Sequence, residues 1–290
     1  MDKLRIITSS NTDINAVYFG IALSGYEYAD IDKSDDIIEM LQQIRSYSGL
    51  DEAKQYFSNT RQPLCEVYPF WPRAALLESA TFFINGKSFD FDSYCTYVKA
   101  LPNLTTEEKS EDFFCWAKDS PKYVTQIKSD PFFQNINTRI HSKVTETSLN
   151  SIEKTRLIEG KLEKLSATVE SAISTISLII CPFKCVYSAD YFTEGSVMSV
   201  ILGNFLPSSI VHEYLHPIVR LHIKKYRERI VTLDGIKHLD LDKSYYMNND
   251  EKRLLNAFEE NIVRKISDSI LYEIEINIEK LIFSELSNKV

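Results

Sequence analysis

The chain of 290 residues is 44% hydrophobic and has only eight Gly, so it can bury a sizeable core, built mainly from helices, as one large domain or two smaller ones. The formal net charge is −8, and no segment interleaves Lys and Arg with aromatic residues, which argues against nucleic acid as a partner. No apolar run reaches the ~18 residues that a membrane-spanning helix needs, so no membrane span is predicted.

Targeting signals and cysteines point to the compartment. The amino terminus lacks the long apolar segment of a secretory signal. We therefore expect a cytoplasmic protein, or a secreted one from which a signal peptide has been removed. The five Cys are odd in number and are expected to be reduced, mostly buried thiols rather than a disulfide framework.

The first half of the chain has the pattern of successive helices. An apolar run from Ile14 to Leu23 ends at Gly25, a typical helix stop. Ser34, followed by two Asp, is predicted to cap a second helix with apolar residues at helical spacing. Further helices are predicted over residues 73–83, 89–100 and 105–118.

The composition changes after residue 145. Residues 148–170 are polar and charged, which indicates an exposed helix or a connecting arm. Two strands are predicted next, over residues 173–187 and 196–205, with residues 189–195 as the turn between them. A helix is expected after Pro207, and residues 250–290 have a helical pattern throughout. We expect regions at 1–150 and 151–290, as two domains or as one continuous domain.

The pentad His212-Glu213-Tyr214-Leu215-His216 carries the chemistry, because it is an H-E-x-x-H sequence in a helix-compatible run. Two His four residues apart lie on one face of a helix, so both imidazoles can bind one metal ion. Glu213 lies beside that face, where a carboxylate can take a proton from an activated water. The pattern predicts a zinc site.

A catalytic zinc ion needs a third protein ligand, and the sequence offers three routes. The candidates are a downstream glutamate, a second histidine ten residues after the first, or an upstream thiolate: Glu259 or Glu260, His222, and Cys181 or Cys185. His222 would need a sharp turn that other zinc enzymes make with Gly. Val219 stands there instead, and a β-branched residue resists positive φ. The two Cys lie in an apolar, strand-like run and are typical of buried thiols.

The choice between Glu259 and Glu260 depends on the orientation of the last long helix. Its apolar positions define one buried stripe: Leu255, Phe258, Ile262 and Ile266. Glu259 lies nearer to this stripe on the helical wheel, and Glu260 lies further round. The wheel alone therefore favours Glu259. Glu260 is favoured instead if the ligand must face a site between two helices and not the centre of the core.

Four segments of the chain resemble the zincin metallopeptidases whose third ligand is a glutamate, and among these a bacterial family of H-E-x-x-H domains of unknown function. The segments are Gly25-Tyr26-Glu27-Tyr28, Glu111-Asp112-Phe113-Phe114, the run from Leu206 to His216, and Glu260-Asn261-Ile262-Val263-Arg264. The pentad and the last segment are the specific ones. Pro217 and Lys265 depart from the family pattern, and Pro217 predicts a kink just after the second His.

The resemblance implies a predominantly helical α+β fold, with a helical N-terminal half and, over residues 151–290, a zincin-like catalytic region that contains a small sheet. Carried over residue by residue, it implies that His212, His216 and Glu260 bind Zn²⁺. It also places a tyrosine that stabilises the oxyanion between the two metal-binding helices, and we assign this role to Tyr246 rather than to Tyr245.

We therefore predict a zinc-dependent metallopeptidase that acts on a peptide or protein substrate, with Glu213 as general base. Residues 196–205 are expected to form the sheet edge that binds the substrate by backbone hydrogen bonds. One alternative is a zincin-fold binding protein without activity, against which Glu213 argues, since a structural zinc site needs no base. A four-ligand structural site would need His238 as well. The other alternative is a zinc-dependent hydrolase of a non-peptide amide.

Overall fold

The computed structural model describes residues 3–26, 32–65, 74–84, 90–101, 117–166, 171–186, 188–232, 251–271 and 277–287. The chain divides into two compact units, each built from separate segments. Unit 1 comprises Met1–Arg5, Glu153–Ser174 and Leu206–Val290, and unit 2 comprises Ile6–Ile152 and Thr175–Phe205.

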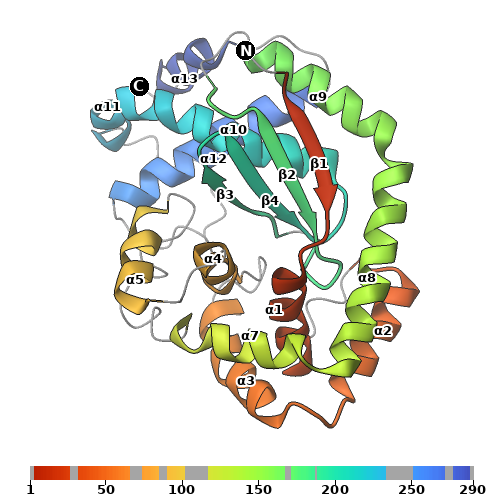
Figure 1. The fold of residues 1–290 in the computed structure, drawn as a ribbon. Helices are drawn as coiled ribbons and strands as arrows, with labels where there is room; N and C mark the ends of the chain where they lie inside the picture. Colours follow the sequence, from red (N-terminus) through yellow and green to blue (C-terminus); the bar gives the residue numbers. More distant parts are fainter. Residues whose placement is uncertain are drawn as a thin grey trace. The chain divides into compact units, whose positions relative to one another are not determined.

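Unit 2 contains the helices of the first half of the chain (Figure 1). These are α1 (Thr12–Leu23), α2 (Asp35–Arg45), α3 (Asp51–Cys65), α4 (Ala75–Ile84), α5 (Phe91–Ala100), α7 (Ser120–Lys128) and α8 (Pro131–Asn150). The predicted end of the first helix at Gly25 is confirmed to within two residues, as are both ends of the helices predicted over residues 73–83 and 89–100. Ser34 is the N-cap of α2, as predicted. The helix predicted at 105–118 lies almost entirely outside the described residues.

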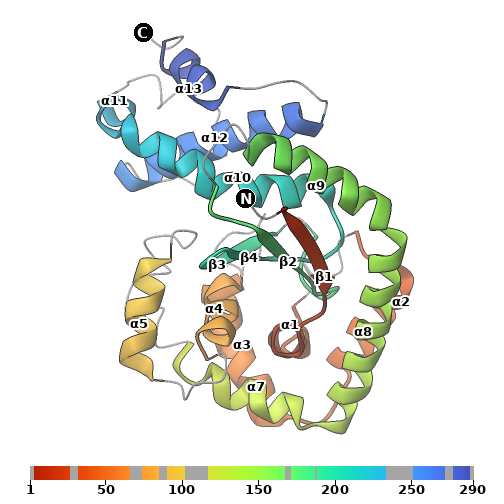
Figure 2. The ribbon, with the colours of Figure 1, turned by 45° about the horizontal axis from the view of Figure 1, so that its top comes forward.

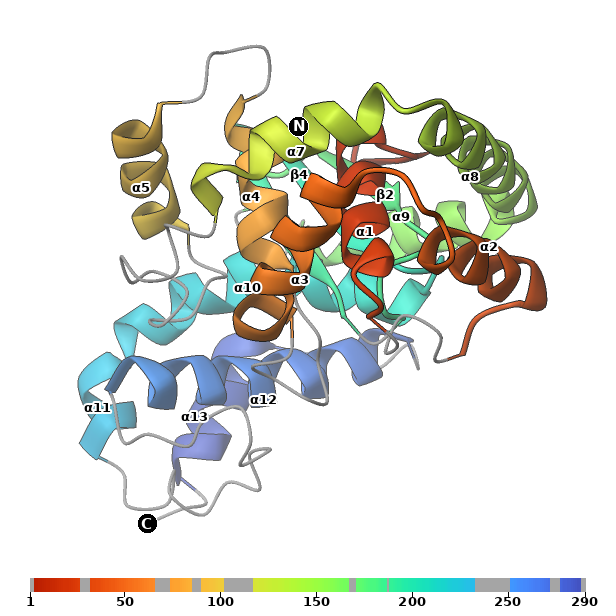
Figure 3. The same ribbon diagram turned by 90° about the horizontal axis from the view of Figure 1, so that it is seen from below.

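Helix α1 forms the centre of unit 2, and α2, α3, α4, α7 and α8 all contact it (Figure 3). Every residue of α1 from Ile14 to Leu23 is buried, as expected for a helix that is hydrophobic on all sides. Gly20 allows the closest approach, because a Cβ at this position would lie only 2.2 Å from the ring of Phe57 on α3. The apolar run recognised in the sequence is therefore the core helix of this unit.

The sheet of unit 2 has four strands in the order β1-β2-β4-β3 (Figure 1). The strands are β1 (Arg5–Ser9, of which Arg5 belongs to unit 1), β2 (Thr175–Ile180), β3 (Asp190–Glu194) and β4 (Val197–Leu202). Strand β4 pairs with β2 in parallel and with β3 in antiparallel orientation. The small mixed sheet and the many helices confirm the predicted α+β, predominantly helical fold class.

Two predictions about this sheet are wrong. Residues 189–195 are not a turn, because Asp190–Glu194 form strand β3, and only the positive-φ Gly195 and its neighbour turn the chain into β4. The run Tyr191-Phe192-Thr193 is rich in strand-forming residues, but it is short and lies next to Gly195, whose presence favours the prediction of a turn. Strand β4 is also not an edge, since β2 and β3 flank it; the edge strands are β1 and β3.

The division of the chain differs from the expected one at residue 150. A boundary does lie close by, between residues 152 and 153, but Thr175–Phe205 return to the helical unit. Strand pairing is the physical reason, because β2 and β4 complete one hydrogen-bonded sheet with β1 from the amino terminus.

A buried ionic cluster lies inside unit 2. The ammonium group of Lys184 lies 2.9 Å from a carboxylate oxygen of Glu78 and 2.7 Å from one of Asp190, and it also donates to the hydroxyl of Tyr18. Lys184 and Glu78 are fully buried. A buried charge is tolerated only when it is paired and hydrogen-bonded, so these contacts must stay intact for the unit to fold.

Unit 1 consists of helices that pack around a long pair. It contains α9 (Ile152–Ser166, whose first residue belongs to unit 2), α10 (Pro207–Lys225), α11 (Arg227–Thr232), α12 (Glu251–Leu271) and α13 (Ile278–Ser287). Helices α10 and α12 lie side by side, and α13 contacts both (Figure 2). None of the helices among the described residues is long and apolar enough to cross a bilayer.

Candidate metal centre

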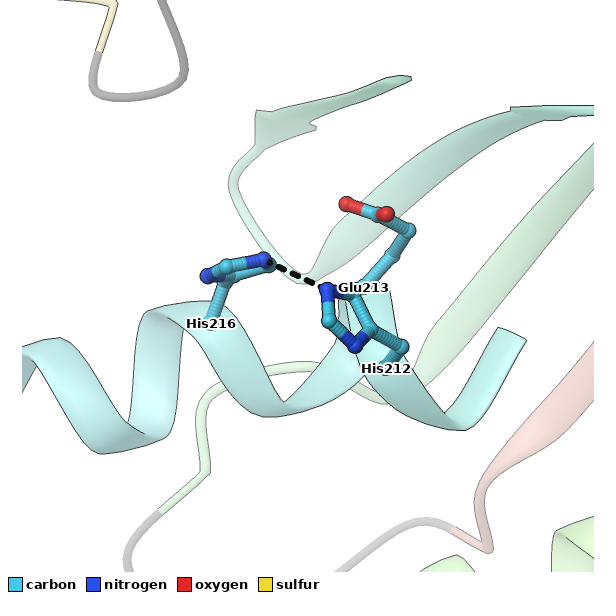
Figure 4. Close-up of side chains that lie close together, drawn as sticks. All are labelled: His212, Glu213 and His216. Atoms are coloured by element: carbon cyan, nitrogen blue, oxygen red, sulfur yellow. Dashed lines mark hydrogen bonds between the residues drawn. The ribbon is translucent and has the colours of Figure 1, made fainter. Parts of the chain in front are cut away.

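Helix α10 presents the two pentad histidines on one face. Pro207 occupies its first turn, and the apolar side chains of Val211 and Leu215 are fully buried, which fixes the rotation of the helix. His212 and His216 are then neighbours on the remaining face, with their Nε2 atoms 3.2 Å apart (Figure 4). The helix continues through Pro217 to Lys225.

Helix α12 brings a carboxylate to the same point. Its buried residues Phe258, Ile262 and Val263 pack in the core, so the residue between them on the neighbouring face is directed toward α10. This residue is Glu260, whose Oε1 lies 3.4 Å from Nε2 of His212 and whose Oε2 lies 3.5 Å from Nε2 of His216. Three potential ligand groups from two helices therefore converge.

The spacing of these groups fits a zinc ion. Zn–N bonds are about 2.0 to 2.1 Å long, so ligand atoms of a tetrahedral zinc ion lie about 3.3 to 3.4 Å from one another. Here the two Nε2 atoms are 3.2 Å apart, and each lies 3.4 or 3.5 Å from a different oxygen of the Glu260 carboxylate. Two imidazoles and one carboxylate are also a donor set of catalytic zinc sites, which leave one position open. The residues present thus fit the ion that the sequence predicts.

Glu213 lies beside the two histidines (Figure 4). Its side chain is buried, and a carboxylate oxygen lies within 4.8 Å of a ring nitrogen of both His212 and His216 (Figure 4). These three residues are the group of metal-binding type found in the part of the chain that the structure describes. Glu213 is close enough to act on a water held at the site.

Glu259 contacts the other nitrogen of one histidine. Its Oε1 lies 2.8 Å from Nδ1 of His216. The guanidinium of Arg220, one turn further along α10, donates from Nε to Oε2 of Glu259 at 2.8 Å and from a terminal nitrogen to Oε1 at 2.5 Å. Glu259 is buried, as the helical wheel indicates. Its carboxylate thus lies behind the imidazole and not among the converging atoms.

Arg264 contacts Glu260 from the next turn of α12. Its Nε donates to Oε1 of Glu260 at 2.8 Å, and its side chain is more than half exposed. Neither Arg220 nor Arg264 is among the site residues predicted from the sequence. Each lies four residues after a predicted ligand, His216 or Glu260, and this spacing on a helix was the available signal.

These contacts shift the acid–base balance of the site. Burial opposes a charged imidazole at His212, but the contact with Glu260 and the negative charge of Glu213 outweigh it and raise the pKa of His212. Burial also opposes ionisation of Glu260, yet the interactions with His212 and His216 outweigh burial and lower its pKa. Hydrogen bonds from His216 and Arg220 likewise overcome burial and lower the pKa of Glu259. Both glutamates are therefore carboxylates at neutral pH.

The other candidate residues lie elsewhere. Because α10 continues past Val219, His222 stays on the helix, with its Nδ1 3.3 Å from Oε1 of Glu279 on α13. Cys181 and Cys185 are buried in unit 2, and burial raises the pKa of Cys181 to about 12, so it is a protonated thiol and not a thiolate ligand. Three further candidates lie outside the described residues: His238, Tyr245 and Tyr246.

Comparisons with known proteins do not identify a family for this chain. No family model, no curated protein and no solved structure matches the chain. The resemblance to glutamate-ligand zincins therefore stays a prediction from the segments quoted above, as does the role of each ligand.

Proposed function

We propose that this protein is a zinc-dependent metallopeptidase, with His212, His216 and Glu260 as metal ligands. One observation carries the proposal. Three donor groups of a catalytic zinc site converge with separations of 3.2 to 3.5 Å, and a fourth group, the carboxylate of Glu213, lies beside them. Such sites occur where a water attacks a carbonyl carbon.

When bound, Zn²⁺ would polarise the scissile carbonyl and lower the pKa of a water molecule in the open position. The carboxylate of Glu213 would accept a proton from the attacking water and then deliver it to the nitrogen of the leaving amine. His212 and His216 would hold the metal ion through their Nε2 atoms, and Glu260 would hold it through its carboxylate. Tyr246 is proposed to donate a hydrogen bond to the developing oxyanion.

Glu213 supports an enzyme over a binding protein that has kept only the fold. A structural zinc site uses four protein ligands and no general base. Glu213 is buried directly beside the two histidines, within reach of a water that a metal ion at the site would hold, and this position supports a chemical role for its carboxylate. A peptide or protein substrate remains the class that we propose.

The decisive experiment compares the zinc-loaded protein with its Glu213→Gln variant on a diverse peptide library, with cleavage products identified by mass spectrometry. Gln has the same shape but cannot accept the proton, so zinc content should be unchanged while turnover falls by a factor of about 10² to 10⁴. Cleavage by the unmutated protein alone would support the peptidase. Zinc-loaded samples that both fail to cut would favour a binding protein.

A further inference from the structure

A second set of contacts lies behind His216, on the side away from the converging ligand groups. We propose that Glu259 and Arg220 form a positioning pair that holds His216 in the tautomer with its proton on Nδ1. The reason why this tautomer matters rests on the proposed zinc site, but the pair itself is a property of the metal-free protein.

The hydrogen bond between His216 and Glu259 determines the tautomer. An ionised carboxylate can only accept hydrogen bonds, and a neutral imidazole has a single N–H. At 2.8 Å from Oε1 of Glu259, Nδ1 of His216 must therefore be the nitrogen that carries the proton. Nε2 then carries the lone pair, and this is the atom that lies among the donor groups of His212 and Glu260. The tautomer selected by Glu259 is the one that a metal ion requires.

Arg220 holds the carboxylate of Glu259 in the orientation in which it contacts the imidazole of His216. Its Nε and a terminal nitrogen donate to the two different oxygens of Glu259, and this fork leaves the carboxylate one orientation. Only 4% of the Glu259 side chain is exposed, so water competes little for these contacts. Because Oε1 receives both His216 and Arg220, a rotation of the carboxylate would break two hydrogen bonds at once.

The position of the pair along the helices also suits this role. Arg220 and His216 come from α10 and Glu259 comes from α12, so the contacts connect the two helices at the level of the site. Pro217 lies between His216 and Arg220 and has no backbone N–H to donate within α10. A side-chain contact across to α12 supports the helix where its own hydrogen bonding is weakened.

His212 provides an internal comparison. Among the described residues, the polar contacts of its ring all involve Nε2, and its Nδ1 has no hydrogen-bond partner like Glu259. The positioning pair thus acts on one of the two histidines. A change in Glu259 or Arg220 should alter the tautomer of His216 and leave that of His212 unaltered.

The test is nitrogen NMR on the metal-free, ¹⁵N-labelled protein at an alkaline pH at which the spectra show neutral imidazoles. Long-range ¹H–¹⁵N spectra distinguish a protonated from an unprotonated ring nitrogen. In the unmutated protein, His216 should carry its proton on Nδ1. Glu259→Ala should release this preference and populate the form with the proton on Nε2. An unmutated protein with the proton on Nε2, or a Glu259→Ala variant with no change, would overturn the proposal.

Two further variants separate positioning from a merely structural salt bridge. Glu259→Gln keeps an acceptor oxygen toward His216 and should keep the tautomer. Arg220→Met frees the carboxylate of Glu259 to rotate and should give a mixture of the two His216 tautomers. This variant replaces Glu259→Ala in the test if Glu259→Ala does not fold. Lys265→Met, which removes a contact between α12 and Glu285 of α13, is the matched control and should change nothing at His216. Equal effects of all variants on the tautomer would contradict the positioning role.

Zinc binding gives the second readout, with Zn²⁺ itself as the probe in competition with a chelator. Loss of an outer-shell partner typically lowers metal affinity by about 10- to 100-fold, and we expect this loss for Glu259→Ala, while Glu259→Gln should bind zinc nearly as well as the unmutated protein. If the tautomer results hold and no variant, nor the unmutated protein, binds zinc, the positioning pair stands and the proposed function falls. Unchanged zinc affinity in Glu259→Ala would count against the pair.

Discussion

Glu259 and Glu260 are neighbours in the chain, yet their carboxylates lie at opposite nitrogens of one imidazole ring. Oε1 of Glu259 is 2.8 Å from Nδ1 of His216, and Oε2 of Glu260 is 3.5 Å from its Nε2. Successive residues of a helix point about 100° apart, so α12 can place one carboxylate behind the ring and the next one in front of it. Two adjacent residues of the same type thereby have different surroundings.

The first prediction concerns the metal. Elemental analysis of protein purified without a chelator should find about one zinc ion per chain, as one tetrahedral site requires. His212→Ala and His216→Ala should each abolish it, because either change leaves only two of the three protein ligands. Full zinc content in both variants would remove the basis of the proposed function.

The second prediction separates the two glutamates. Glu260→Gln removes a charged ligand and should weaken zinc binding by more than the factor of about 10 to 100 typical of an outer-shell change. Glu259→Gln keeps a hydrogen-bond acceptor and should leave zinc binding nearly intact. The affinities are measured side by side by chelator competition. The reverse order would mean that the ligand is Glu259 and that Glu260 has another role.

The third prediction concerns pH. Zinc binding needs a neutral His212, and in the metal-free protein its pKa is raised above 6.5, mainly by Glu260 against the effect of burial. Zinc and the proton therefore compete, and zinc affinity should fall steeply as the pH is lowered from about 8 to 6.

The stability of the metal-free protein should change with pH in the opposite sense to its zinc affinity. A raised pKa means that the charged pair between His212 and Glu260 stabilises the fold fully below about pH 6.5 and that this contribution is lost as the pH rises through the raised pKa. The difference in melting temperature between zinc-loaded and metal-free protein should thus increase with pH. A difference that is constant over this range would contradict the competition.

The fourth prediction concerns the buried ionic cluster of unit 2. Lys184→Met leaves the carboxylates of Glu78 and Asp190 buried without their cation, which should cost about 3 to 5 kcal/mol in the free energy of unfolding. Denaturant titration measures it. The control is Lys122→Met, which breaks an exposed pair with Glu52 and should change the free energy of unfolding far less, because water screens that pair. Equal costs would show that the cluster is not a special requirement.

Local patterns predicted the parts of this molecule that depend on local spacing. The helix stop at Gly25 and the cap at Ser34 follow from backbone preferences of single residues. The convergence of His212 and His216 follows from their spacing of four on a helix. The burial of Glu259 was visible on the helical wheel, because it lies next to the apolar stripe of α12.

Features that depend on distant pairing were not accessible in this way. The sequence predicts a turn where strand β3 lies, because these five residues are followed directly by Gly195, and only the pairing with β4 identifies them as a strand. The spacing of Arg220 from His216 places it on the face of the site, but its pairing with Glu259 joins residues 39 positions apart and depends on how α10 packs against α12. The return of Thr175–Phe205 to the helical unit likewise results from hydrogen bonds between strands that are far apart in the chain.

The discontinuous course of the chain has a practical consequence for dissecting this protein. The chain passes between the units after residues 5, 152, 174 and 205. A cut near residue 150 would leave strands β2, β3 and β4 on the fragment that carries the candidate metal site and would separate them from β1. A fragment that starts at residue 151 would therefore expose an unpaired strand edge and should aggregate. A minimal version of the site needs a designed linker from Ser174 to Leu206 that spans the length of the sheet it replaces, because β2 and β4 are parallel.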